Sequence, residues 1–273
     1  MLRQPCFHAI AAVLVAVTSR LAAQSPAVQP EPAHDLNALA KETQNPVGNL
    51  TTVPFQFNFN TGGDLEDRTF FNLNFQPVIP FKLNSSVSVV ARTIVPINSA
   101  PAGDGRSSGI GDIQEQIFFT PAKPGGMIWG VGPTFSFPTA TAAVSETGTW
   151  AIGPSAVLVK NTGPWVLGSL ISQLWPMADA GGSPEMNLLT IQPFVNYNFD
   201  HGWALSFSPI ISANWDAPEG NEWTVPLGIG LTRTTVFNRR PMNIGVNYYY
   251  NVERPDGGPG QQLRLTVALL YPR

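Results

Sequence analysis

The sequence has very little cysteine and very little charge. Its single cysteine, Cys6, lies in a segment that we expect to be removed, and only 12% of the 273 residues are Asp, Glu, Lys or Arg, about half the share in an ordinary soluble domain. A mature chain without cysteine has no disulfide bond and no thiolate metal site, and it is not a lipoprotein anchored through a cysteine at the cleavage point. The formal net charge of −3 is too small to indicate nucleic-acid binding.

Long apolar runs are also lacking. The apolar run Ala9–Val17 is shorter than the ~20 residues that a transmembrane helix needs. It follows Met1-Leu2-Arg3 and precedes the small pair Ala22-Ala23, which is the pattern of a secretory signal peptide. We therefore predict a signal peptide at residues 1–23; the alternative is an uncleaved N-terminal anchor.

Residues 24–49 are predicted to form a periplasmic leader. Within it, His34–Gln44 places Leu36, Leu39 and Ala40 on one side and is followed by Pro46, which favours a short amphipathic helix. Such a helix could plug or brace the periplasmic mouth of a barrel. The other interpretation, a loosely ordered leader, fits the sequence equally well.

The polarity of the chain comes from Asn, Gln, Ser and Thr, so the mean hydropathy stays near zero at +0.03 despite the few charges. Transmembrane β-strands have this mixture, because apolar residues face lipid and neutral polar residues face the interior. The stretch Leu189–Trp215 shows the alternation clearly over two arms around the turn Phe199–Gly202. A period of two over this length predicts two long antiparallel strands.

From residue 50 onward the same pattern predicts twelve strands, each long enough to cross a bilayer at a tilt. They are Leu50–Asn60, Thr69–Ile79, Ser85–Ile97, Ile110–Thr120, Met127–Phe137, Thr149–Lys160, Trp165–Trp175, Met186–Phe199, Trp203–Trp215, Glu222–Thr234, Met242–Val252 and Gln261–Tyr271.

The connections between these segments alternate between short turns and longer loops rich in Gly, Asp, Ser and Pro. Short periplasmic turns and longer outer loops around an even strand count are typical of outer-membrane barrels. We therefore predict an all-β chain whose residues 50–273 form a single antiparallel transmembrane β-barrel of about 12 strands in the bacterial outer membrane. Arginine at Leu205 or Ile211, on the lipid-facing parity, should then impair insertion by ~2–4 kcal/mol.

All seven tryptophans lie at or near predicted strand ends. Separations of ten to twelve residues within a strand correspond to about 25–30 Å along the membrane normal, the spacing of two aromatic girdles. We predict membrane-girdle positions for Trp129, Trp150, Trp165, Trp175, Trp203, Trp215 and Trp223.

Two features conflict with regular strands. Eight prolines lie inside the predicted strands, where each removes a ladder N–H, and bulges could absorb them; they are Pro54, Pro77, Pro96, Pro133, Pro154, Pro193, Pro209 and Pro226. Glu115 shares the parity of Ile113, Ile117 and Phe119, so it would face lipid unless a bulge near Gly111 shifts the register.

No catalytic or metal constellation is found. The histidines outside the signal segment are His34 in the leader and His201 in a turn, and they form no Ser/His/Asp set or metal-ligand spacing. We predict no enzymatic activity, no metal and no cofactor.

The polar parity of the strands is the remaining functional surface. Its neutral amides surround only three charges, so we predict either a narrow lumen for a small solute or an interior hydrogen-bond network that fills a small barrel with its charges paired. The lumen-lining candidates are Arg92, Asp112, Gln114, Gln116, Gln192, Asn196, Asn214, Asn247 and Arg264.

Ordered motifs along nearly the whole mature chain resemble an outer-membrane transporter family named for the meta-pathway of phenol degradation, whose members are often mislabelled neuromedin U. The matching segments include LAKETQNPVGNL (Leu39–Leu50), NFQPVIPF (Asn74–Phe81), RTIVPI (Arg92–Ile97), GIGDI (Gly109–Ile113), FFTPAKPG (Phe118–Gly125), WGVGPTFSFPTAT (Trp129–Thr141), QPFVNYNF (Gln192–Phe199), ANWDAPEGNEWTVPLG (Ala213–Gly228) and YYNVERPDGGP (Tyr249–Pro259). The resemblance implies a barrel and transport, with aromatic compounds among the solutes, and it supplies no binding residues.

The functional expectation is a passive channel or transporter for a small solute, with outer-membrane lipid and the barrel-assembly machinery as partners and no nucleic acid. The alternatives are a sealed structural barrel without flux and a soluble secreted β-protein.

Overall fold

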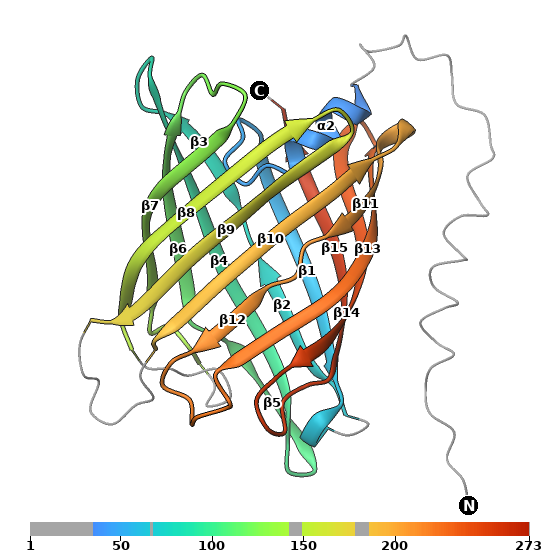
Figure 1. Ribbon diagram of the computed structural model, residues 1–273. Helices are drawn as coiled ribbons and strands as arrows, with labels where there is room; N and C mark the ends of the chain where they lie inside the picture. Colours follow the sequence, from blue (N-terminus) through green and yellow to red (C-terminus); the bar gives the residue numbers. More distant parts are fainter. Residues whose placement is uncertain (1–34, 66–67, 142–148, 178–185, 273) are drawn as a thin grey trace, which may run out of the picture. The chain divides into compact units, whose positions relative to one another are not determined.

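The structure is a computed structural model that describes residues 35–65, 68–141, 149–177 and 186–272. The predicted signal peptide, residues 24–34 of the leader and parts of three predicted long loops lie outside the described residues. Figure 1 shows a single closed β-barrel with one short helix, α2 (Leu36–Thr43), at one end. No helix in the described part of the chain is long and apolar enough to cross a membrane.

Fifteen strands of the described chain form one antiparallel sheet. They are β1 (Thr51–Thr61), β2 (Phe70–Phe75), β3 (Val78–Lys82), β4 (Val87–Ala102), β5 (Gly105–Ile110), β6 (Ile113–Pro121), β7 (Ile128–Phe137), β8 (Ala151–Thr162), β9 (Trp165–Pro176), β10 (Leu188–Asn198), β11 (Trp203–Phe207), β12 (Ile211–Asn214), β13 (Trp223–Phe237), β14 (Arg240–Glu253) and β15 (Gln261–Tyr271).

The sheet closes because β1 pairs with β15 over their whole lengths, from Thr51 opposite Tyr271 to Thr61 opposite Gln261. Three positions of the barrel are each filled by two consecutive strands, β2 with β3, β5 with β6, and β11 with β12, so the fifteen strands make a twelve-stranded barrel. The predicted fold class is confirmed, and the predicted strands match the observed ones to within a few residues at most ends.

Two of the strand interruptions occur at prolines that the sequence flagged. The chain leaves the ladder at Pro77 between β2 and β3 and at Pro209 between β11 and β12, and the register between β13 and β14 shifts at Pro226. Bulges and breaks therefore absorb three of the eight prolines, as expected.

The other five prolines stay within strands. Pro133 lies directly opposite Pro154 on the neighbouring strand, so two missing N–H groups fall at one place in the ladder. On one side, Pro193 pairs in register with Ser169 of β9. On its other side lies the break at Pro209, since the pairing of β10 with β12 stops at Ile191 and its pairing with β11 begins at Val195. Pro133, Pro154 and Pro193 therefore stay in the ladder without a shift of register at these pairings.

The apolar parity faces outward. On β14, Tyr248 and Tyr250 are about half exposed, whereas Asn247 and Asn251 on either side of them are buried. Strand β13 repeats the pattern, because Leu227, Ile229 and Leu231 are exposed on its outer face. An apolar band on the outside and amides on the inside are the arrangement that a bilayer requires.

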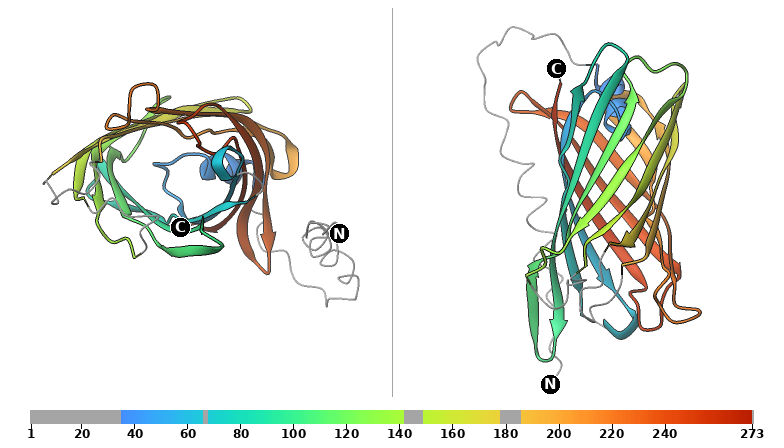
Figure 2. Two further views of the ribbon diagram at one scale, coloured as in Figure 1. Left: turned by 90° about the horizontal axis from the view of Figure 1, so that it is seen from below. Right: turned by 90° about the vertical axis from the view of Figure 1, so that its left-hand side faces the viewer.

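The short turns lie at the same end of the barrel as α2 and the C-terminal strand end, at the top of Figure 1. The longer connections lie at the opposite end, where β4 and β5 extend as a hairpin beyond the other strands (Figure 2). We call these the periplasmic and outer ends, following the rule that short turns face the periplasm.

Contact of the outer face with lipid can be tested by placing arginine at two different depths along the strands. Ile229 lies six residues from Trp223 and four from Arg233, which pairs with Trp203, whereas Leu205 lies only two residues from Trp203. Ile229→Arg should reduce the free energy of folding into liposomes by ~2–4 kcal/mol. For Leu205→Arg we now expect less than the ~2–4 kcal/mol predicted from the sequence, because this residue lies close to Trp203 and the cost of a charge falls toward the interface. Leu83→Arg, in a periplasmic turn, is the matched control and should change it little. Equal folding of all three variants would show that the outer face does not contact hydrocarbon.

Candidate functional site

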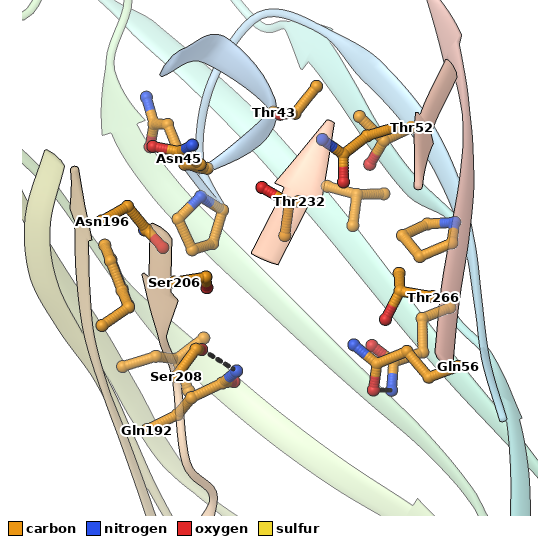
Figure 3. Close-up of a pocket in the computed structure, with 18 of the residues that line it drawn as sticks. Thr43, Asn45, Thr52, Gln56, Gln192, Asn196, Ser206, Ser208, Thr232 and Thr266 are labelled. Carbon is orange, nitrogen blue, oxygen red and sulfur yellow. Dashed lines mark hydrogen bonds between the residues drawn. The ribbon is translucent and has the colours of Figure 1, made fainter. Parts of the chain in front are cut away.

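A cavity of about 210 Å³ lies inside the barrel beneath the leader segment. Its floor and walls come from nine strands, and residues Thr43–Pro46 and Leu50 cover its periplasmic side. Figure 3 shows hydroxyl and amide side chains facing this space from both sides, with Gln192 and Ser208 on one side and Gln56 and Thr266 on the other. Of the described residues that line it, only Arg92 and Arg264 are charged.

Arg264, on β15, is almost completely buried, with 5% of its surface exposed. Its Nε donates to Asn58 Oδ1 at 2.8 Å and its Nη2 donates to Gln262 Oε1 at 2.9 Å. A longer bond of 3.5 Å joins its Nη1 to the carbonyl oxygen of Ser208. The guanidinium carbon also lies 5.1 Å from the ring centre of Tyr249, a favourable cation–π distance.

Arg92, on β4, is held in the same way. Its Nη1 donates to Gln116 Oε1 at 2.8 Å and its Nη2 to Gln76 Oε1 at 3.1 Å. Gln76 in turn donates to Gln56 on β1. In the described residues, all five hydrogen bonds from the two guanidinium groups therefore end on neutral oxygens.

The interior wall that holds these arginines is a network of amides. Asn58 donates to Asn72 Oδ1 at 3.0 Å, and Asn72 donates to Asn98 Oδ1 at 2.7 Å. Gln262 donates to Asn60 Oδ1 at 2.9 Å. We call this set of residues on β15, β1, β2, β4 and β6 the amide wall: Gln56, Asn58, Asn60, Asn72, Gln76, Asn98, Gln116 and Gln262.

The strand break at Pro209 contributes to the site. Since β11 ends at Phe207, the carbonyl oxygen of Ser208 is not paired in the ladder and instead accepts from Tyr249 Oη at 3.0 Å and from Arg264. The Ser208 hydroxyl accepts from Gln192 Nε2 at 3.1 Å. The break thus makes a backbone carbonyl oxygen available as a hydrogen-bond acceptor for interior side chains.

The opposite side of the interior is apolar toward the periplasmic end. A buried cluster, which we call the apolar wall, lies largely on β8, β9 and β10 and surrounds Val47 of the leader; its members are Val47, Val90, Phe118, Val157, Val159, Val166, Leu170 and Phe194. Leu170 and Phe194 also line the cavity. In the described chain, the cavity therefore has an amide side that carries the two arginines and an apolar side.

The leader helix α2 lies within the periplasmic mouth of the barrel (Figure 2). Asp35 caps its first turn by accepting from the N–H groups of Asn37 and Ala38. Gln44, at its C-terminal end, and Asn198 of β10 exchange two side-chain hydrogen bonds, of 3.0 and 3.1 Å. The Gly202 N–H, in the turn before β11, donates to Asn37 Oδ1 at 2.9 Å. The sequence left open whether this helix docks in the mouth, and the structure places it there.

Other cavities lie at the two ends of the barrel. One of about 370 Å³ lies between α2 and the periplasmic ends of β6, β7 and β8. Glu42 lines it, and partial burial raises the pKa of this carboxyl above its ordinary value of 4.5. Another, of about 470 Å³, lies at the outer end, where Asn214, Glu222 and Asp256 line it.

Five of the nine lumen-lining candidates line the central cavity: Arg92, Gln192, Asn196, Asn247 and Arg264. Gln116 lies behind Arg92 as its acceptor, and Asn214 lines the outer cavity instead. Gln114 lies on the same strand parity as Gln116, nearer the outer end.

Asp112 does not line a cavity that the structure describes. It is buried between β5 and β6, where its carboxylate accepts from the N–H groups of Thr139 and Ala140, each at 3.0 Å. Asp112 therefore holds the start of an outer loop in place through these two backbone N–H groups.

Glu115 faces outward even though the chain is interrupted at Gly111. It lies opposite Thr93 and Phe135 in the sheet, and the Thr93 hydroxyl donates to its carboxylate at 2.6 Å. The interruption therefore does not move this side chain to the interior.

The tryptophans gather near the two ends of the strands. Trp165 packs edge-on against Tyr197, with ring centres 4.8 Å apart, and Arg233 lies over Trp203 at 5.0 Å near the periplasmic end. Trp215 and Trp223 meet at 5.6 Å near the outer end. The seven side chains are half-buried or exposed, and their role at the membrane interface stays a prediction.

The described residues hold no group of three or more His, Cys, Asp or Glu side chains able to bind a metal. His201 lies in a periplasmic turn with a positive φ of 60°, away from the cavity's lining.

Sequence reasoning missed two parts of the site. Tyr249 is 1% exposed and faces inward; its parity with Asn247 and Asn251 was the available signal, which the neighbouring Tyr248 and Tyr250 concealed. The apolar wall was missed because Val157 and Leu158 make both parities of β8 apolar, and alternation gives no direction there.

No known family model matches the sequence, and neither does any curated protein. Among solved structures, the COG4313 outer membrane channel from Pseudomonas putida F1 is similar, with a TM-score of 0.59 and 14% identity over 89% of this chain and 100% of that one. The NanC porin matches with a TM-score of 0.51 and 11% identity over 80% of this chain and 98% of that one. Outer membrane phospholipase A from Escherichia coli reaches a TM-score of only 0.42 at 11% identity, over 81% and 96% of the two chains, too low to support an argument about chemistry. The fold is that of a bacterial outer-membrane β-barrel, and the apolar outer band places the chain in that membrane.

The reciprocal pair of Gln44 and Asn198 gives a test of how the leader docks. Gln44→Ala and Asn198→Ala should each speed hydrogen exchange of the α2 amides, and the double variant should add little, because either change removes both bonds. The coupling should be about 1–2 kcal/mol, the contribution of two neutral hydrogen bonds. Lys41→Ala, which removes an exposed bond to the Gly163 carbonyl, is the control and should have a smaller effect. Additive single-variant effects would mean that the pair does not hold the helix.

Proposed function

We propose that this chain is a passive channel of the bacterial outer membrane that carries a small solute, and that it belongs to the outer-membrane transporter family whose motifs its sequence resembles. The observation that best supports a channel is the presence of one cavity in the centre of the barrel and one at each of its ends. A barrel whose interior served only as packing would have no need of three such spaces.

The lining of the central cavity also favours transport. Neutral amides and hydroxyls can exchange hydrogen bonds with water or with a passing solute at little net cost, and such linings are found in selective pores. The similar solved structures with TM-scores above 0.5 are described as a channel and a porin, which favours transport over catalysis. The proposed role includes no enzymatic step and no cofactor.

The size of the space limits the solute. Twelve strands enclose little room once side chains are inside, and the leader occupies part of the periplasmic mouth. The solute is therefore small, and the family resemblance extends the proposal to aromatic compounds.

The competing function is a sealed barrel whose interior is filled by the amide wall and the leader. Conductance of the purified protein in planar bilayers, together with swelling of liposomes in small solutes, separates the two. A channel gives solute-dependent permeability, and a sealed barrel gives none above that of protein-free membranes.

A matched pair of substitutions on β15 tests whether flux passes through the central cavity. Thr266 lines the cavity, and its neighbour Val267 faces outward beside Ile244. Thr266→Trp should lower single-channel conductance severalfold because the indole fills the cavity, whereas Val267→Trp should leave it unchanged. Heat-modifiable migration on gels would confirm that both variants fold, and equal conductance would place the path elsewhere.

A further inference from the structure

The central cavity carries two positive charges, from Arg92 and Arg264, which both line it. Among the described residues, no Asp or Glu lines it with them. Their hydrogen bonds within the described chain end on amide and carbonyl oxygens. Burying a charge without a counter-charge is costly, so a barrel that needed only to fill its interior would gain from a neutral side chain at these positions.

We propose that this cavity binds a small organic anion, a monocarboxylate with an apolar body, as the preferred solute of the channel. That the channel transports this anion rests on the proposed function. That the cavity binds it is argued from the geometry of the cavity alone.

The guanidinium groups have donors to spare. A guanidinium carries five N–H donors. Arg92 uses two of them and Arg264 uses three in bonds to the described protein, which leaves three and two. Guanidinium groups bind carboxylates through paired, charge-assisted hydrogen bonds, and the fixed acceptors on Gln76, Gln116 and Asn58 hold the two groups in place before the anion arrives.

The apolar wall supplies the other half of the recognition. Leu170 and Phe194 line the same cavity as the arginines and face a ligand's body without competing for its carboxylate. A cavity of about 150 Å³ holds one benzene molecule, so the observed 210 Å³ suits a single ring or a short branched chain with one carboxylate. A hydrophilic dianion fits this pair of walls less well, because its second charge would meet the apolar side.

Selectivity of the channel for anions tests the charge. Under a KCl gradient, the reversal potential should indicate chloride permeability severalfold above that of potassium. Gln116→Glu and Gln262→Glu place carboxylates at positions that already accept from Arg92 and Arg264 with almost no change in shape, so the double variant should lose this preference. Arg233→Gln and Lys160→Gln, both outside the cavity's lining, make the same change of two in net charge and should keep it.

Binding in detergent solution tests the site independently of flux. Benzoate should bind the purified protein in calorimetry, and benzamide, its neutral analogue, should bind about tenfold more weakly, as expected for the loss of one charge-assisted interaction. Gln116→Glu should weaken benzoate about tenfold and leave benzamide unchanged, and Arg233→Gln should affect neither.

The two assays separate the possible failures. Benzoate binding without any conductance would defeat the proposed channel and leave the anion site standing. Conductance with no preference for anions, or equal binding of benzoate and benzamide, would overturn the anion site and leave the channel standing.

Discussion

A strand inside a bilayer has no water to satisfy its peptide groups, so every N–H and C=O must find a partner within the protein. This constraint explains the full-length pairing of β1 with β15, which leaves the barrel without an edge. It also makes the breaks in the ladder informative. At Pro77 the freed carbonyl accepts from the Thr93 N–H, and at Pro209 the freed carbonyl of Ser208 accepts from Tyr249 and Arg264. The prolines are tolerated because interior and neighbouring groups use the oxygens that the breaks release.

Closure also decides what the interior can hold. A twelve-stranded barrel leaves a space narrow enough for side chains on different strands to contact one another, so polar residues of its interior form a connected network. Arg264 is supported from β1, from its own strand and from the break after β11. Each support is neutral, and together they hold a charge that no single amide could hold in a buried place.

The fold was predictable from the sequence because a period of two, long strands and sorted loops all indicate one architecture. The same pattern predicted that the apolar residues of each strand face outward and that Asn247 and Arg264 face inward. The site was predictable only in part. Asp112 shares the interior parity, yet it binds the backbone of Thr139 and Ala140, because a carboxylate near a strand end meets loop N–H groups first. Such a choice depends on loop geometry that strand patterns do not contain.

The two interior walls differ in polarity because the leader packs against one of them. Val47 needs an apolar surface in order to dock, and β8 and β9 provide it with Val157, Val159 and Val166; this is why the alternation of polar and apolar residues fails on those strands. A guanidinium cannot lie on that side, because it would find no acceptors there. The arginines are therefore restricted to the amide wall. Glu222 and Asp256, which line the outer cavity, are not among the described residues that line the central one. The positive charge of the central cavity therefore comes from Arg92 and Arg264, which the amide wall holds in place.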